Sequence, residues 1–325
     1  MPKSNQRILV HGSIAIDYIM DFDDNLYKNC SVNEEKKEFE MTVMPNTKKV
    51  QFGGTAGNIS YNLGLLGANC EVLTSVGRDF ETSWYKKKFS TFKNIKLNLI
   101  EHSDGFCANC YIVNDINKQQ LIIYHGGVTQ RIPEKNLKER GISAENFSWA
   151  INSPENPQQM INVSLELYKL GINTILDPGQ VTPAFTGVQI KNMISQSNIL
   201  ICNEHEFNMV KDKTGLKDSE IIDKISSVII TKGAKGSILK TLNGETLIPI
   251  VEPERVVDPT GAGDGYRAGL IMALSQGLPV EYGCKVGATV GSFVVETKGG
   301  QSHVFNKKQF KERFERTFGT LELEL

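Results

Sequence analysis

One run of eight residues, Asp258-Pro259-Thr260-Gly261-Ala262-Gly263-Asp264-Gly265, combines a flexible backbone with two acidic side chains. Three glycines within five residues let the backbone turn sharply and approach a ligand closely. The mostly apolar run of residues 266–274 predicts a helix. The first N–H groups of this helix and the positive end of its dipole would bind a phosphate. Asp264 would then accept a proton from a hydroxyl that attacks this phosphate. The alternative is a purely structural glycine turn in which the aspartate caps the helix.

This run matches neither of two common phosphate-binding loops. The pattern G-x-x-x-x-G-K-[ST] does not occur, and Gly233-Ala234-Lys235-Gly236-Ser237 has the wrong spacing for it. The pair Gly261-x-Gly263 lacks the third glycine of a dinucleotide-binding fingerprint. The sequence therefore excludes a P-loop and a Rossmann fingerprint at this position.

Two further groups of residues have spacings that suit ligand binding. Gly53-Gly54-Thr55-Ala56-Gly57-Asn58 leads into apolar residues that predict a helix over residues 58–66. Asn203 and Glu206 follow a short apolar strand and share one face of a helical turn. An amide and a carboxylate placed in this way fit Mg²⁺ held through water molecules. The same pair fits a capping box at a helix N-terminus, and the residues alone leave both interpretations open.

Short apolar strands at residues 8–10, 174–176, 199–201 and 228–230 alternate with helical segments. This alternation predicts an α/β fold with a mostly parallel sheet, helices on both faces, and ligands at the carboxyl ends of the strands. Two β-rich pieces, residues 13–53 and 104–127, are predicted to form a small separate sheet that acts as a lid. The α/β core would then comprise residues 1–12, 54–103 and 128–325.

The composition is that of an ordinary globular protein of 325 residues. Lys plus Arg is 36 and Asp plus Glu is 37, so a nucleic-acid partner bound by charge is not expected. The absence of an apolar stretch of about 18 residues and of a signal-peptide pattern predicts no membrane partner. Six cysteines predict free thiols and a cytoplasmic location. Cys107-x-x-Cys110 has no second pair that would complete a zinc site.

The two glycine signatures resemble those of the PfkB/ribokinase family of carbohydrate and nucleoside kinases, and their order and separation fit that family. Gly12 with Asp17, Asn203-x-x-Glu206 and Thr231-x-Gly233 extend the resemblance across nearly the whole chain. The resemblance implies a ribokinase-like three-layer core with a β-rich lid. It also implies ATP as the co-substrate and Mg²⁺ as the cofactor.

The resemblance assigns a role to individual residues. Asp264 would be the catalytic base, and the backbone N–H groups of the glycine turn would stabilise charge on the transferred phosphoryl group. The N–H groups are those of Gly261, Ala262 and Gly263. Other residues would bind the acceptor hydroxyls, ATP or the metal. These are Asp17, Gly54 and Asn58 for the acceptor; Asn203, Thr231, Gly233 and Ala288 for ATP; and Glu206, with Asn203 through water, for Mg²⁺.

Arg267, Asp177-Pro178-Gly179-Gln180 and Asn203-Glu204-His205-Glu206 resemble the adenosine-kinase-like branch of the family. We therefore expect ATP-dependent phosphorylation of the ribose 5′-hydroxyl of a nucleoside, with adenosine preferred. The alternatives are a free-sugar kinase of ribokinase or fructokinase type and a non-catalytic sugar- or nucleotide-binding protein. A monomer or a lid-mediated homodimer is expected.

The segments expected around the acceptor, residues 12–17, 53–58 and 106–112, contain no Lys or Arg, which disfavours a sugar-phosphate acceptor. Apolar and aromatic residues in the same segments are predicted to enclose a nucleobase. These are Ile14, Ile16, Phe106, Tyr111 and Ile112.

Overall fold

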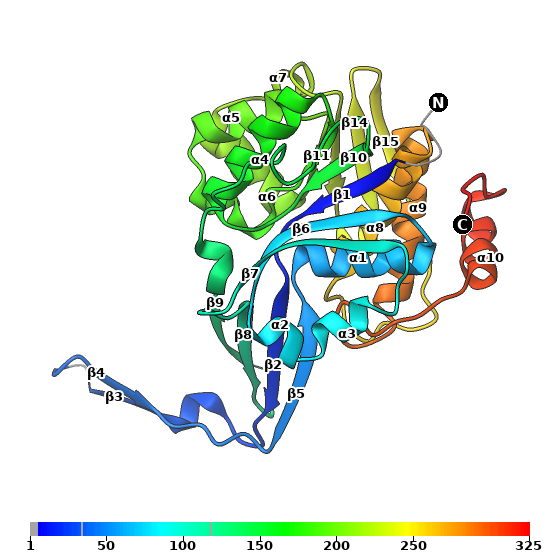
Figure 1. Cartoon of the computed structure of the whole chain (residues 1–325). Coiled ribbons are helices and arrows are strands. Elements are labelled where there is room, and N and C mark those ends of the chain that lie inside the picture. The colour runs from blue at the N-terminus through cyan, green and yellow to red at the C-terminus, as the bar shows by residue number, and fades with distance from the viewer. Residues whose placement is uncertain (1–5, 34, 118) are drawn as a thin grey trace.

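The computed structural model describes residues 6–33, 35–117 and 119–325. Its larger sheet has nine strands: β1 (Arg7–His11), β6 (Cys70–Gly77), β7 (Ile95–His102), β10 (Phe147–Asn152), β11 (Asn173–Leu176), β12 (Ile199–Asn203), β13 (Ser227–Thr231), β14 (Ser237–Thr241) and β15 (Gly244–Ile248). Their spatial order is β15-β14-β13-β12-β11-β10-β1-β6-β7 (Figure 1). The strands from β13 to β7 are parallel, and β14 and β15 add an antiparallel edge.

Alternate residues of each central strand belong to different hydrophobic clusters. In β12, Ile199 and Ile201 lie in one cluster, whereas Leu200 and Cys202 lie in another. Successive side chains of a strand point to opposite faces of the sheet, so both faces are buried. This double burial explains why the strands are continuous apolar runs.

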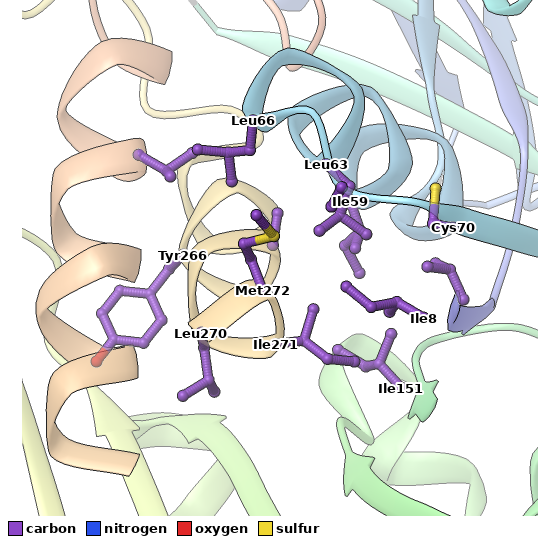
Figure 2. Packing of buried hydrophobic residues seen from close by; sticks show 14 of the residues in the cluster. Ile8, Ile59, Leu63, Leu66, Cys70, Ile151, Tyr266, Leu270, Ile271 and Met272 are labelled. Atoms are coloured by element: carbon purple, nitrogen blue, oxygen red, sulfur yellow. The ribbon is translucent and has the colours of Figure 1, made fainter. Parts of the chain in front are cut away.

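The helices divide between the two faces. The cluster that holds Ile199 also contains residues of α1 (Thr55–Leu66), α8 (Ala262–Ser275), α9 (Val280–Val294) and α10 (Lys307–Phe318). Figure 2 shows Ile59, Leu63 and Ile271 of this layer packed toward strand residues Ile8 and Ile151. The opposite cluster contains residues of α4 (Pro157–Leu170), α5 (Gly187–Ser195) and α6 (Glu204–Thr214). Three short helices complete the list: α2 (Asp79–Thr82), α3 (Tyr85–Phe89) and α7 (Asp218–Ile222).

A second, four-stranded sheet has the order β5-β2-β8-β9 and lies beside the core (Figure 1). Its strands are β2 (Ala15–Asp21), β5 (Thr47–Gly53), β8 (Ala108–Asn114) and β9 (Gln120–His125), which fall inside the two β-rich pieces. A hairpin of β3 (Cys30–Asn33) and β4 (Glu38–Met41) projects from it. The outer strands β5 and β9 are edges of this sheet, and pairing of two lids in a homodimer stays a prediction.

The ribokinase-like three-layer α/β fold predicted from the sequence is confirmed. The four strands predicted by residue range are present as β1, β11, β12 and β13, whereas α1 and α8 begin three and four residues earlier than expected. Strands β7, β14 and β15 were missed by the sequence analysis, although Asn243-Gly244 between the last two is a strong hairpin signal. In the described part of the chain, no helix has the length and apolar character that a membrane span requires.

Candidate active site

Both glycine-rich runs end at helix N-termini. Gly54 is the N-cap of α1 and Gly261 is the N-cap of α8, with φ angles of 82° and 81°. A side chain at position 54 would lie 2.6 Å from the backbone nitrogen of Ala15, and one at position 261 would lie 2.5 Å from Cα of Gly300. Positive φ and close backbone approach therefore both require glycine here. Helices α1 and α8 pack against each other, so the two runs meet in space although about 200 residues separate them.

Asp264 lies in the first turn of α8 and is half-buried. Asn58 Nδ2 donates a hydrogen bond of 2.7 Å to Asp264 Oδ2. Burial raises the pKa of Asp264 to about 7, although the positive charge of Arg267 and the hydrogen bond from Asn58 both lower it. The charge of Asp177 raises this pKa further. A carboxylate with a pKa near neutrality suits a general base.

The N–H groups at the start of α8 do not all remain open. The N–H of Ala262 donates to the carbonyl of Pro259 at 3.1 Å, which closes the turn. No acceptor among the described residues pairs with the N–H of Gly261 or Gly263. The structure therefore leaves these two donors available to an anion, whereas the sequence analysis had also assigned Ala262.

Asp17 lies on lid strand β2, directly opposite Gln51 of β5 and Cys110 of β8. A side chain at position 53 would lie 2.6 Å from Asp17 Oδ2, so the glycine there leaves room for this carboxylate. Burial raises the pKa of Asp17 to about 6. No described residue donates a hydrogen bond to its side-chain oxygens, which leaves them free for a polyhydroxylated ligand.

Arg267 and Asp177 form a buried ion pair beneath the glycine turn. Arg267 Nε and Nη2 donate to the two oxygens of Asp177, with the Nη2–Oδ1 distance at 2.7 Å. Arg267 Nη1 donates to the carbonyl of Gly263 at 3.0 Å. The two residues are 7% and 1% exposed, so they exclude water from the pair. Sequence analysis noted both residues but did not place them together, because 90 residues separate them.

Asn203 and Glu206 form the capping box at the start of α6. Asn203 Oδ1 accepts from the N–H of Glu206, and Glu206 Oε2 accepts from the N–H of Asn203, both at 2.8 Å. Glu206 Oε1 receives no hydrogen bond from a described residue, and burial raises the pKa of Glu206. The pair therefore forms the capping box, and Glu206 Oε1 remains open to a hydrated cation.

The other residues assigned to ATP lie on neighbouring elements. Thr231 ends β13 and is paired with Asn203 at the end of β12. Gly233 has a φ of 56° and open space around its Cα. Ala288 lies on α9 and is partly buried against the core. The described residues contain no cluster of three or more His, Cys, Asp or Glu side chains that would hold a metal by themselves.

Only some of the residues predicted to enclose a nucleobase lie on a surface that a ligand beside Asp17 could reach. Ile14 and Ile16 are completely buried in the core and are not exposed to a ligand. Tyr111 is paired with Tyr18 across the strands and stacks on its ring at 5.0 Å, on the lid face opposite to that of Asp17. Tyr124, which sequence analysis missed, is paired with Cys110 and therefore shares the face of Asp17.

Comparison with known proteins places nearly the whole chain in one family. The model of the pfkB family of carbohydrate kinases matches residues 6–307. The chain belongs to this family. It is therefore a phosphotransferase with an alcohol group as acceptor, as the sequence analysis expected.

Three relatives of this kinase illustrate the range of the family. The chain is 29% identical over 315 residues to a nucleoside kinase of Methanocaldococcus jannaschii, covering 96% of this chain and 97% of the relative. It is 27% identical to a ribokinase of Dictyostelium discoideum, covering 80% and 89%. The structure of the Burkholderia thailandensis nucleoside kinase in complex with inosine superposes with a TM-score of 0.80 at 27% identity, covering 98% of this chain and 100% of that one.

The ion pair beneath the turn leads to a stability prediction. Arg267→Met leaves the Asp177 carboxylate buried without a partner, and should lower the free energy of unfolding by about 3–5 kcal/mol. The double variant Asp177→Asn/Arg267→Met removes both charges and should recover a large part of that loss. Urea denaturation of the three proteins measures the difference. Equal losses in the single and double variants would contradict the prediction.

Proposed function

We propose that this kinase transfers the γ-phosphate of ATP to the ribose 5′-hydroxyl of a nucleoside, with adenosine preferred. The observation that carries the proposal is the position of Asp264 in the first turn of α8, beside open N–H donors and Asn58. The nucleoside kinase relatives, one of them in complex with inosine, support a nucleoside acceptor. The ribokinase relative keeps a free sugar as the second candidate.

The proposed reaction is an in-line displacement. Asp264 accepts the proton of the 5′-hydroxyl as its oxygen forms a bond to the γ-phosphorus, and the bond from that phosphorus to the β-phosphate oxygen breaks to release ADP. The N–H groups of Gly261 and Gly263 face the charge that develops on the transferred group. Loss of one such donor typically raises the barrier by about 3 kcal/mol. Positioning and charge stabilisation supply most of the acceleration in phosphoryl transfer.

The acceptor is proposed to lie between the lid and α1. Asp17 would accept hydrogen bonds from the sugar hydroxyls, while Asn58 and the backbone at Gly54 would bind the same ring. Tyr124, which is 61% exposed, would present its ring to the nucleobase. Residues 13–53 and 104–127 would close over the bound nucleoside as a lid and exclude water from the transfer.

ATP is proposed to occupy the carboxyl ends of β12 and β13, as ligands do in parallel sheets. Asn203, Thr231 and Gly233 would face its phosphates, and Ala288 would line its base. Glu206 would hold a hydrated Mg²⁺ through its open oxygen, with Asn203 beside it. A bound Mg²⁺ neutralises charge on the β- and γ-phosphates in such reactions.

The first test concerns the proposed base. Asp264→Asn keeps the shape of the side chain but cannot accept the proton, so kcat should fall by at least about a hundredfold. Because the pKa of Asp264 is raised to about 7, the wild-type kcat/KM should fall roughly tenfold per pH unit below that pH, where the carboxylate is protonated. Near-normal turnover of a folded Asp264→Asn protein would reject the assignment.

The second test separates the metal role of Glu206 from its structural role. Glu206→Gln keeps the capping box, since glutamine serves at this position, but removes the charge. The Mg²⁺ concentration for half-maximal rate should therefore rise while the melting temperature stays unchanged. Glu220 likewise accepts from the N–H of Lys217 at the start of α7, so Glu220→Gln is the matched control and should change neither quantity. An unchanged Mg²⁺ profile in Glu206→Gln would leave only the capping role.

The third test concerns the acceptor. We expect kcat/KM to be highest for adenosine in a panel with inosine, cytidine, ribose, fructose and fructose 6-phosphate. Base stacking is worth about 1–3 kcal/mol in nucleic-acid complexes, so Tyr124→Ala should lower kcat/KM for nucleosides by roughly tenfold or more. Its effect on ribose should be small. If ribose or a hexose exceeds every nucleoside, the nucleoside assignment is wrong and only the family assignment stands.

A further inference from the structure

Residues 299–301, Gly299-Gly300-Gln301, lie between the two glycine turns, in the connection from α9 to α10. The N–H of Gly299 donates to Asp258 Oδ2 at 2.8 Å, which ties the segment to the turn before α8. A side chain at position 300 would lie 2.7 Å from Asn58 Cγ on α1. The segment therefore touches both helices whose N-termini form the site.

The side chain of Gln301 connects this segment to Asn58. Gln301 is 2% exposed, and its Nε2 donates to Asn58 Oδ1 at 3.0 Å and to the Tyr85 hydroxyl at 2.6 Å. The Tyr85 hydroxyl in turn donates to the carbonyl of Gly53 at 2.5 Å. Lys88 Nζ donates to the backbone carbonyl of Gln301 at 2.5 Å, which anchors the segment to α3.

The carboxylate of Asp264 fixes the direction of the hydrogen bonds that run from it through Asn58 to Gln301. The ionised carboxylate of Asp264 only accepts, so the atom of Asn58 that faces it is the amide nitrogen. The other amide atom, Oδ1, must then accept, and Gln301 supplies the donor. A reversed Gln301 amide would place two acceptor oxygens against each other.

This arrangement leaves one polar atom unsatisfied. Both hydrogens of Gln301 Nε2 are used, and Gln301 Oε1 is buried without a hydrogen-bond partner in the described structure. An unpaired buried acceptor costs free energy. An amide therefore stands at this position although its oxygen gains nothing, which indicates that the donor to Asn58 is what the site requires.

We propose that Gln301 is a positioning residue of the phosphoryl-transfer step. It holds the amide of Asn58 so that one Nδ2 hydrogen points at Asp264 and the second remains for the acceptor hydroxyl. Gln301 touches neither substrate nor the reacting atoms and acts through Asn58. The inference rests on the proposed role of Asp264 as the base.

The test compares Gln301→Met with a matched control. Gln301→Met removes both donors at nearly constant size, so Asn58 is free to rotate and kcat should fall by at least about tenfold. Loss of the Asn58 hydrogen bond, which lowers the pKa of Asp264, should also move the acidic limb of kcat/KM to higher pH. The KM for ATP should stay unchanged.

Tyr85→Phe is the control because it removes the hydrogen bonds of the Tyr85 hydroxyl with Gly53 and with Gln301 Nε2, while the donor from Gln301 to Asn58 remains. It should lower the melting temperature without moving the acidic limb. If Gln301→Met keeps the wild-type kcat and acidic limb, or if Tyr85→Phe moves the limb equally, the proposal is overturned.

Two further variants keep the test decisive. If Gln301→Met does not fold, Gln301→Leu replaces it, since its side chain carries no donor for Asn58 and should cause the same loss and shift. A wild-type profile in Gln301→Leu overturns the proposal. Asp264→Asn separates the two levels of the argument: normal turnover there rejects the base itself. A loss there, beside normal Gln301→Met kinetics, rejects only the role of Gln301.

Discussion

The proposed chemistry depends on keeping one carboxylate, that of Asp264, near ionisation while the fold removes much of its surface from water. Burial alone favours the protonated acid, which cannot act as a base. Arg267 and Asn58 oppose that effect, one by charge and one by a hydrogen bond, and the resulting pKa is about 7. Asp177 and Gln301 matter because they hold these two neighbours in place. The immediate surroundings of the turn therefore serve a single electrostatic requirement.

A second constraint is steric. Around the N-termini of α1 and α8 the chain packs so closely that side chains at positions 54, 261 and 300 would overlap backbone or amide atoms of neighbouring segments. Glycine at these positions allows side chains of the first turns of α1 and α8 to lie within hydrogen-bonding distance of each other, as the Asn58–Asp264 contact shows. Such proximity converts a bimolecular reaction into a positioned one, which is a main source of rate in phosphoryl transfer.

The family assignment and the proposed choice of acceptor rest on different parts of the molecule. Membership of the pfkB family rests on a match to nearly the whole chain, including the glycine turn on the core. The proposed choice between a nucleoside and a free sugar lies with the lid, whose strands carry Asp17 and Tyr124 on one face. Because these strands form a separate sheet, their side chains can vary without disturbing the buried turn on the core.

The sequence by itself determined the glycine turn with Asp264, the alternating strands and helices, and the family, because these are local patterns that follow from short-range chemistry. The tertiary structure decided what no local pattern contains. It paired Arg267 with Asp177 and Gln301 with Asn58, which are 90 and 243 residues apart in the sequence. Strand register, not composition, put Tyr124 rather than Tyr111 on the face of Asp17, since a shift of one residue reverses the face.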